Sequence, residues 1–138
     1  TGNELKKAKS YVKKHHLSKQ VSFLDYIPHE KIFSHLVKQH LSVINSYNFD
    51  TQGMTILEAI SCGIPVLYVD PAMNEVIPKN GGIQVSDTTP ESLARIIDYL
   101  FDNPELIHQM SKIMLKNQKT VLESTQLKKL LKLYNPKS

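Results

Sequence analysis

The stretch DTQGMTILEAISCGIPVLYVD, residues 50–70, decides the fold of this chain. Residues 53–61 are almost all apolar, and Gly63 and Pro65 follow directly, which predicts a helix that ends near residue 62. Residues 65–70 form a continuous apolar run, the pattern of a strand that is covered on both faces. A buried strand directly after a helix indicates a βα unit of a parallel sheet.

Patterns on either side of this stretch extend the same architecture. Short β-prone runs alternate with segments of helical periodicity, and Ser, Thr, Asn and Pro residues supply caps at helix starts. The expected strands are residues 21–26, 41–45, 65–70 and 83–85. The expected helices are residues 1–20, 29–39, 53–61, a helix capped by Thr89 and a long one from Asn103 to about residue 123. We therefore expect an α/β fold, a Rossmann-like parallel sheet with helices on both faces.

Length and composition narrow the classes of protein to which the chain can belong. A length of 138 residues with 41% hydrophobic and 22% charged residues is typical of one globular domain, residues 1–138, and argues against disorder. Cys62 is the single cysteine, which excludes an intrachain disulfide and a cysteine-based zinc site and favours a reducing, cytoplasmic location. No apolar run reaches 18 residues, so we expect no transmembrane helix, and no leader pattern indicates a signal peptide.

The basic residues are almost all lysines. The 17 basic residues exceed the 13 acidic ones by four, and Arg95 is the single arginine. Because base recognition relies on the bidentate guanidinium group, we expect no nucleic-acid partner. Five lysines between residues 6 and 14 lie on the first expected helix, where Thr1 and Glu4 fit a capping box. They form either a solvated helix face or a contact with an anionic membrane surface or an acidic acceptor.

Glu58 is the one charged residue between Asp50 and Asp70, and no Lys or Arg lies three or four positions from it. A carboxylate within an apolar helix costs several kcal/mol unless it is hydrogen-bonded or reaches water. Glu58 either points off the helix edge into solvent or binds a ligand. Its spacing favours the second reading, because Asp50 precedes the same helix start and Gly53 lets a ligand approach the backbone. Two carboxylates beside an anion-binding helix end suit a nucleotide sugar.

These residues carry a family resemblance. Residues 46–66, SYNFDTQGMTILEAISCGIPV, resemble the signature of family 4 retaining glycosyltransferases: an acidic residue, seven intervening positions, Glu-Ala, and then Gly-x-Pro-Val. The segment DPAMNEVI at 70–77 is similar to the loop that follows this motif in the family. Within the family, Thr51-Gln52-Gly53 looks most like enzymes that make glucosylated glycolipids.

The resemblance implies the C-terminal, nucleotide-sugar-binding domain of a GT-B glycosyltransferase. It would transfer the hexose of a UDP-hexose or GDP-hexose donor, with retention of the anomeric configuration, to a lipid or polysaccharide acceptor. No metal and no cofactor are implied beyond the donor. Glu58 would hold the ribose, and Tyr26 and Ile27 would lie against the base. The implied catalytic residue is Asp50, and the implied substrate-binding residues are Glu58, Thr51, Gln52, Gly53, Met54, Thr55, Tyr26 and Ile27.

The chain departs from the family pattern in three ways. Asp50 replaces the commoner Glu, and Asp25 replaces a Gly. The first strands of the domain, the Arg and Lys that clamp the diphosphate, and the N-terminal acceptor domain are expected outside this chain. We therefore expect the chain alone to be inactive, and the whole enzyme to be cytoplasmic or peripheral on the inner face of the membrane. The alternative is a non-catalytic, Rossmann-like binding or interaction module derived from such an enzyme.

Overall fold

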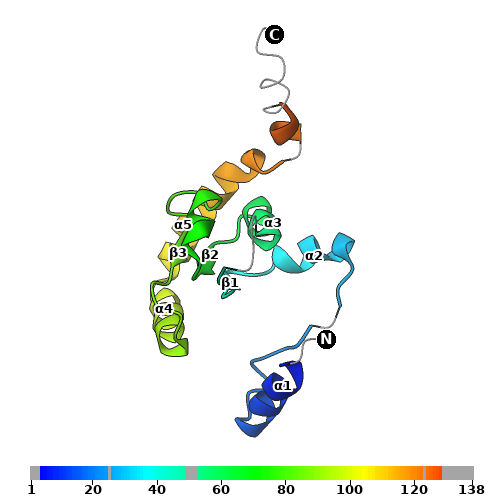
Figure 1. Cartoon of the computed structure of the whole chain (residues 1–138), viewed down its shortest axis with the longest axis vertical. Helices are drawn as coiled ribbons and strands as arrows, with labels where there is room; N and C mark the ends of the chain where they lie inside the picture. The colour runs from blue at the N-terminus through cyan, green and yellow to red at the C-terminus, as the bar shows by residue number, and fades with distance from the viewer. Residues whose placement is uncertain (1–3, 25, 49–52, 123, 129–138) are drawn as a thin grey trace. The chain divides into compact units, whose positions relative to one another are not determined.

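The computed structural model describes residues 4–24, 26–48, 53–122 and 124–128 (Figure 1). The chain divides into two compact units, Thr1–Ile32 and Phe33–Ser138, which are described separately.

The first unit contains helix α1, Leu5–Lys14. The helix is shorter than the twenty residues that the sequence predicts, because His16, two residues after its end, takes a left-handed conformation with φ of 57°. Glu4 occupies the N-cap position, but no side-chain hydrogen bond satisfies the N–H groups at this end of the helix. The predicted capping box is therefore wrong for Glu4, and Thr1 lies outside the described residues.

The predicted strand at residues 21–26 is absent from the part of that segment that the structure describes. Residues 21–24 and 26–28 have no regular secondary structure, and Leu24 and Tyr26 are exposed. A strand needs a neighbouring strand for its backbone hydrogen bonds, and none pairs with this segment within the described residues. Local β-propensity alone did not suffice to make a strand. Helix α2, His29–Leu36, follows and crosses from the first unit into the second.

The second unit is built on a parallel sheet. Three described strands, β1 (Ser42–Ile44), β2 (Val66–Tyr68) and β3 (Gly82–Gln84), pair in the order β1-β2-β3. Their central residues align in the register Val43, Leu67, Ile83. All three residues of β2 are buried, as expected for a central strand.

Helical segments follow each strand of the second unit, and several come in succession after β3. They are α3 (Met54–Cys62), the 3₁₀ turn η1 (Pro71–Glu75), α4 (Pro90–Asp102), α5 (Pro104–Asn117) and the 3₁₀ turn η2 (Gln118–Thr120). The Thr89 hydroxyl caps α4 by accepting a hydrogen bond from the Ser92 N–H at 3.4 Å, as the sequence predicts. The Asn103 side chain does not cap α5. It donates from Nδ2 to the Tyr99 carbonyl at 2.8 Å and so satisfies the end of α4.

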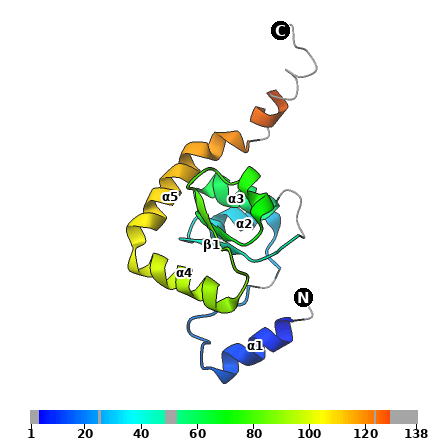
Figure 2. The same cartoon turned by 60° about the vertical axis from the view of Figure 1, so that its left-hand side comes forward.

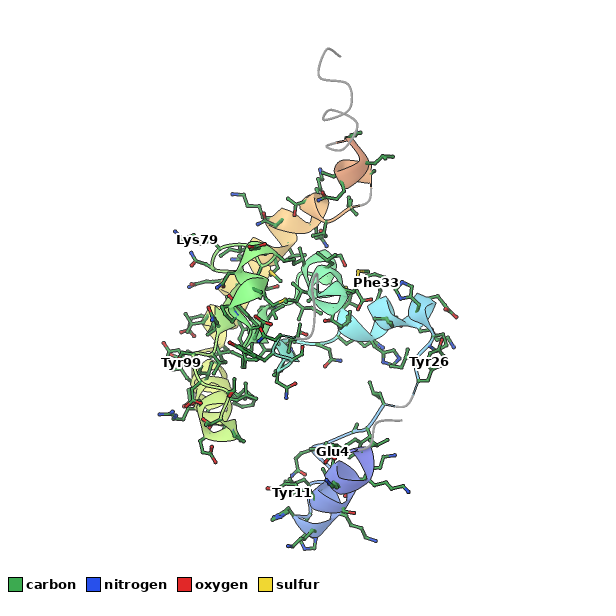
Figure 3. The ribbon with its side chains drawn as sticks, in the orientation of Figure 1. Glu4, Tyr11, Tyr26, Phe33, Lys79 and Tyr99 are labelled. Carbon is green, nitrogen blue, oxygen red and sulfur yellow. The ribbon has the colours of Figure 1, made fainter. Side chains whose placement is uncertain are left out.

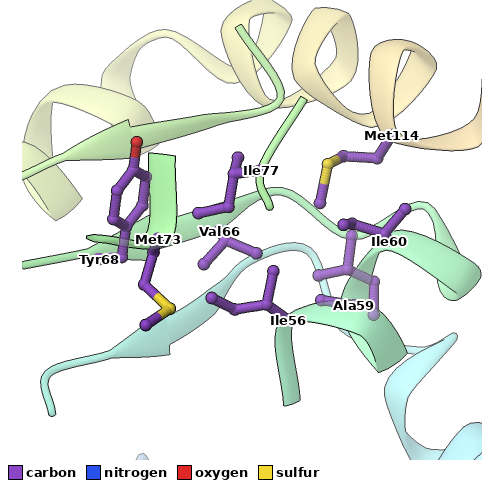
Figure 4. Close-up of a cluster of buried hydrophobic side chains, with 9 residues drawn as sticks. Ile56, Ala59, Ile60, Val66, Tyr68, Met73, Ile77 and Met114 are labelled. Atoms are coloured by element: carbon purple, nitrogen blue, oxygen red, sulfur yellow. The ribbon is translucent and has the colours of Figure 1, made fainter. Parts of the chain in front are cut away.

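Apolar clusters cover both faces of the sheet. On one face, helices α3 and α5 meet β2 through a cluster in which Ile60, Val66 and Met114 are completely buried (Figure 4). On the other face, Leu67 packs in a second cluster with residues of α4 such as Leu93. Figure 2 shows α4 and α5 as consecutive helices beside the sheet. The α/β fold with a parallel sheet and helices on both faces is therefore confirmed.

Gly63 ends α3 and fixes its contact with α5. Its φ is 72°, and N–H groups at the helix end donate to the carbonyls of Ala59 and Ile60. A Cβ atom at this position would lie 2.4 Å from Cδ2 of Leu115, so a side chain here would force Leu115 to move. The Ser111 hydroxyl also donates to the Gly63 carbonyl, at 2.7 Å. The turn between α3 and β2 is therefore held against α5 by shape and by a hydrogen bond.

Candidate functional site

The carboxyl edge of the sheet brings together the residues that the sequence singled out. The strands β1, β2 and β3 end there at Ile44, Tyr68 and Gln84. Helix α3 follows β1, so its N-terminus faces the same edge. Parallel α/β sheets bind ligands in this position, outside the carboxyl ends of the strands. The candidate site is therefore the edge formed by the loop after β1, the start of α3 and the segment after β2.

Gly53 shapes the start of α3. It is buried and has a left-handed backbone, with φ of 52°, which a residue with a side chain adopts only at a cost. A Cβ atom here would lie 2.9 Å from Cδ1 of Ile56 and 3.2 Å from Sδ of Met73. The contact with Met73 shows that the start of α3 lies against η1, the turn after β2. Glycine is therefore favoured here by the left-handed backbone, and a side chain would also force Ile56 and Met73 to shift.

The first turn of α3 presents backbone N–H groups. The Gly53 carbonyl accepts hydrogen bonds from the N–H of Ile56 at 2.6 Å and of Leu57 at 3.2 Å. The N–H groups of Met54 and Thr55 precede these and have no carbonyl within the helix to donate to. Among the described residues, no side chain caps this end. Met54 and Thr55 are exposed, so the positive end of the helix dipole is accessible to an anion.

Glu58 lies one turn further along α3 and is half-buried, beside the fully buried Ala59. Its side chain is therefore only partly in solvent, and its role as a ligand-binding carboxylate stays a prediction. Burial raises the pKa of the nearby Cys62 thiol, a hydrogen bond from Ser61 opposes the rise, and the Glu58 carboxylate adds to it. Cys62 therefore stays protonated at neutral pH and is a poor nucleophile. The Glu58 carboxylate is partly shielded from solvent and lies on the same helix as the accessible N–H groups of Met54 and Thr55.

Asp70 joins the two loops of this edge. It is 4% exposed, and its two carboxylate oxygens accept hydrogen bonds from two different segments. Oδ1 accepts from the Ala72 N–H at 2.9 Å, which caps η1, and Oδ2 accepts from the Asn48 N–H at 2.8 Å. Asn48 has a left-handed backbone, with φ of 53°, and immediately precedes the segment that contains Asp50. Asp70 therefore ties the loop after β1 to the end of β2.

A second polar group lies where β2 and β3 end. The Tyr68 hydroxyl donates to Oδ1 of Asn74, and Nδ2 of Asn74 donates to Oε1 of Gln84 at 3.0 Å. Burial raises the pKa of the Tyr68 phenol, so it remains a donor at neutral pH. The chain of bonds connects η1 to the ends of both strands, and it fixes the side of the edge opposite to the loop after β1.

The remaining predicted site residues fall into two groups. Asp50, Thr51 and Gln52 lie outside the described residues. Tyr26 is 90% exposed (Figure 3) and Ile27 is half-buried, and both belong to the first unit. Their contact with a base therefore stays a prediction.

Sequence reasoning missed the structural roles of Asp70 and Asn74. The dipeptide Asp70-Pro71 after a strand carries a usable signal, because Asp before Pro is a common start for a helical turn. The bond from Asn48 to Asp70 spans 22 positions and had no signal in the local pattern.

Three further observations bound the site. In the described ranges, no three His, Cys, Asp or Glu side chains gather as metal ligands would. No helix among those residues is long and apolar enough to cross a membrane. A pocket of about 740 Å³ lies at the other edge of the sheet, lined by residues that precede β1 and β2 and by α4 and α5, including Leu41, Pro65, Phe101 and His108. It contains none of the candidate site residues.

Comparison with known proteins identifies the family. No curated protein matches the chain. The family profile described as "Glycosyl transferases group 1" matches residues 1–129, which include the first unit, the second unit up to residue 129 and the carboxyl edge of the sheet. The chain therefore belongs to the group 1 glycosyltransferases, enzymes of glycosyl transfer.

Proposed function

We propose that this domain binds a nucleoside diphosphate hexose, with UDP or GDP as the nucleotide, and supports retaining transfer of the hexose to a lipid or polysaccharide acceptor. The observation that carries the proposal is the start of α3. A left-handed glycine begins this helix at the carboxyl edge of the sheet, and no side chain caps it among the described residues. Such a helix start binds phosphate oxygens through its N–H groups and its dipole.

The donor would lie along α3. The N–H groups of Met54 and Thr55 would bind the sugar and diphosphate, and the left-handed backbone of Gly53 would set the helix start that presents them. Glu58 would accept hydrogen bonds from the ribose hydroxyls, since a partly sheltered carboxylate forms strong charge-assisted bonds with them. Asp50 would contact the hydroxyls of the transferred sugar. Thr51 and Gln52 would join the backbone cradle between these two carboxylates.

Catalysis in this scheme is electrostatic. As the glycosidic bond opens, negative charge develops on the leaving diphosphate and positive charge on the sugar ring. Fixed N–H dipoles at the start of α3 stabilise the first, and the Asp50 carboxylate stabilises the second. No metal is required in this proposal. The cationic clamp on the diphosphate and the acceptor-binding domain would come from other parts of the enzyme.

The test compares carboxylates in the enzyme that carries this domain. Glu58→Gln keeps the shape of the side chain but removes charge-assisted hydrogen bonds, each worth roughly 1.5–3 kcal/mol. The affinity for UDP, measured by calorimetry, should fall by about tenfold to a hundredfold. Asp50→Asn should leave UDP affinity nearly unchanged and lower the initial transfer rate. Glu91→Gln, at an exposed position in the first turn of α4, is the matched control and should change neither quantity.

The outcomes separate the candidate functions. Loss of UDP binding in the Asp50 variant but not in the Glu58 variant would reverse the two roles. An enzyme that binds no nucleoside diphosphate at all would be the alternative, a non-catalytic interaction module on the same fold. The anomeric configuration of the product, followed by NMR from the start of the reaction, tests retention directly.

A further inference from the structure

The excess positive charge of this chain lies in its first unit. Residues 1–32 contain seven lysines and three acidic residues, an excess of four. Residues 33–138 contain ten basic and ten acidic residues and are balanced. The net charge of +4 for the whole chain is therefore the charge of the first unit. Such an asymmetry indicates a surface that meets an anionic partner.

Helix α1 concentrates this charge on one side. Successive residues of an α-helix advance by about 100°, so each of the five lysines of α1 can be placed around its axis. All five fall within one continuous arc of about 160°, and Ser10 is the other residue within it. Leu5, Ala8, Tyr11 and Val12 fall in the remaining arc. The helix is thus divided lengthwise into a lysine face, defined by Lys6, Lys7, Lys9, Lys13 and Lys14, and an apolar face.

The structure shows which face is turned outward. Leu5 and Val12 of the apolar face are half-buried, whereas every residue of the lysine face is exposed. Tyr11 is 60% exposed, but its ring packs against His15, with 4.2 Å between the ring centroids. Figure 3 labels Tyr11 on this helix and Glu4 directly before it. Leu5 and Val12 are therefore partly engaged within the protein, Ala8 is exposed, and the lysines are the charged groups presented to a partner.

Three of the five lysines have no partner among the described residues. Lys7 forms an ion pair with Glu4 at 3.0 Å, and Nζ of Lys9 lies 5.7 Å from the centre of the Phe23 ring. Lys6, Lys13 and Lys14 have no acidic group within ion-pair distance in the described part of the chain. These three ammonium groups are available for an external anion.

We propose that the lysine face of α1 binds the surface of an anionic phospholipid bilayer. Lysine ammonium groups on a flexible stem suit a fluid layer of phosphate and carboxylate headgroups, where no fixed bidentate geometry is required. Nucleic acid is the less suitable partner, because the single arginine, Arg95, lies in the second unit and donates to Ser92. Because the apolar face is partly engaged, the contact is electrostatic and involves no insertion of the helix. This inference does not depend on the proposed transfer reaction.

The experiment measures partition of the full chain onto vesicles of phosphatidylcholine with about one third phosphatidylserine, by co-sedimentation at low salt. The variant Lys6→Gln, Lys13→Gln, Lys14→Gln should lower the partition coefficient by on the order of 100-fold, which corresponds to about 3 kcal/mol. The control replaces three exposed lysines of the second unit, Lys79, Lys112 and Lys116, with Gln and should change it little. Both variants lose the same number of charges, so the comparison isolates position.

Two further variants and a change of salt concentration test the electrostatic nature of the contact. Replacing Lys6, Lys13 and Lys14 with Arg should retain binding, which excludes loss of fold as the cause of the Gln result. Tyr11→Ala should also retain binding, because no residue is inserted. Raising the salt to about 1 M, where the Debye length is about 3 Å, should abolish binding. Equal partition onto pure phosphatidylcholine, an equal loss in both Gln variants, or tighter binding to duplex DNA than to the vesicles would overturn the proposal.

Discussion

Replacing Asp70 should release the loop after β1 without dismantling the sheet. The two variants that test this are Asp70→Ala, which removes both hydrogen-bond acceptors, and Asp70→Asn, which keeps one. In the Asn variant the amide oxygen can still accept from the Ala72 N–H within the same turn. The NH₂ group then faces the Asn48 N–H, and two donors cannot bond to each other. The Asn variant therefore breaks the connection to the loop and preserves the cap of η1.

The magnitudes follow from these contacts. A hydrogen bond to a charged group contributes roughly 1.5–3 kcal/mol, and a lost cap typically costs about 1 kcal/mol. Asn48 and Ala72 are exposed residues, so water can replace part of what each N–H loses. We expect the free energy of unfolding to fall by about 2–4 kcal/mol for Asp70→Ala and about 1–2 kcal/mol for Asp70→Asn.

Urea denaturation followed by circular dichroism measures both values, with Asp98→Asn as the control. Asp98 is exposed on α4, and its replacement should change the free energy of unfolding by less than about 0.5 kcal/mol. Amide hydrogen exchange adds a local test. The Asn48 amide should lose protection in both variants, and the Ala72 amide should lose it only in the Ala variant. An Asn48 amide that remains protected in Asp70→Asn would refute the reasoning.

Two further predictions concern backbone geometry and pH. Gly63→Ala should lower the free energy of unfolding by about 2 kcal/mol or more, because it adds a left-handed strain of roughly 1–2 kcal/mol to the overlap with Leu115. Asn80→Gly, at a similar φ of 63°, should not destabilise, and equal thermal shifts for the two variants would contradict this account. The hydrogen bond from the backbone N–H of Thr89 lowers the pKa of Asp87 below its ordinary value of 3.8. The contribution of the Asp87 carboxylate to the free energy of unfolding is therefore complete above pH 3.8 and is lost as the pH falls through the lowered pKa. Between pH 6 and pH 3, Asp87→Asn should therefore lose less stability than the wild type in urea denaturation, and an equal loss would be inconsistent with this role.

The sheet and the helices of the second unit could be predicted because their signals are local. The apolar run of β2 predicts a strand buried on both faces, and the structure buries all three of its residues. Thr89 followed by Pro90 predicts the start of α4, and the hydroxyl forms the expected cap. In both places, the residues that make the pattern also make the structural contacts.

The errors occur where a pattern depends on a distant partner. Residues 21–26 have the composition of a strand, but strand formation also requires a neighbour that composition does not supply. Asn103 is a local exception, since it has the chemistry of a cap for α5 but its side chain bonds to the Tyr99 carbonyl, four positions earlier. In the candidate site, Gly53 and Glu58 were predicted from spacing along one helix. Asp70 was missed because its second bond joins segments 22 positions apart.

The strand order β1-β2-β3 has a consequence for the folding of the second unit. The register pairs Ser42 with Val66 and Val66 with Gly82, positions 24 and 16 residues apart in the chain. By the logarithmic dependence of loop-closure entropy, the two pairings differ in cost by only about 0.4 kcal/mol. Either neighbour can therefore dock first on β2, and parallel routes to the native sheet are expected. No buried residue lies among the described residues of the first unit, so this assembly is expected to proceed at a rate independent of α1.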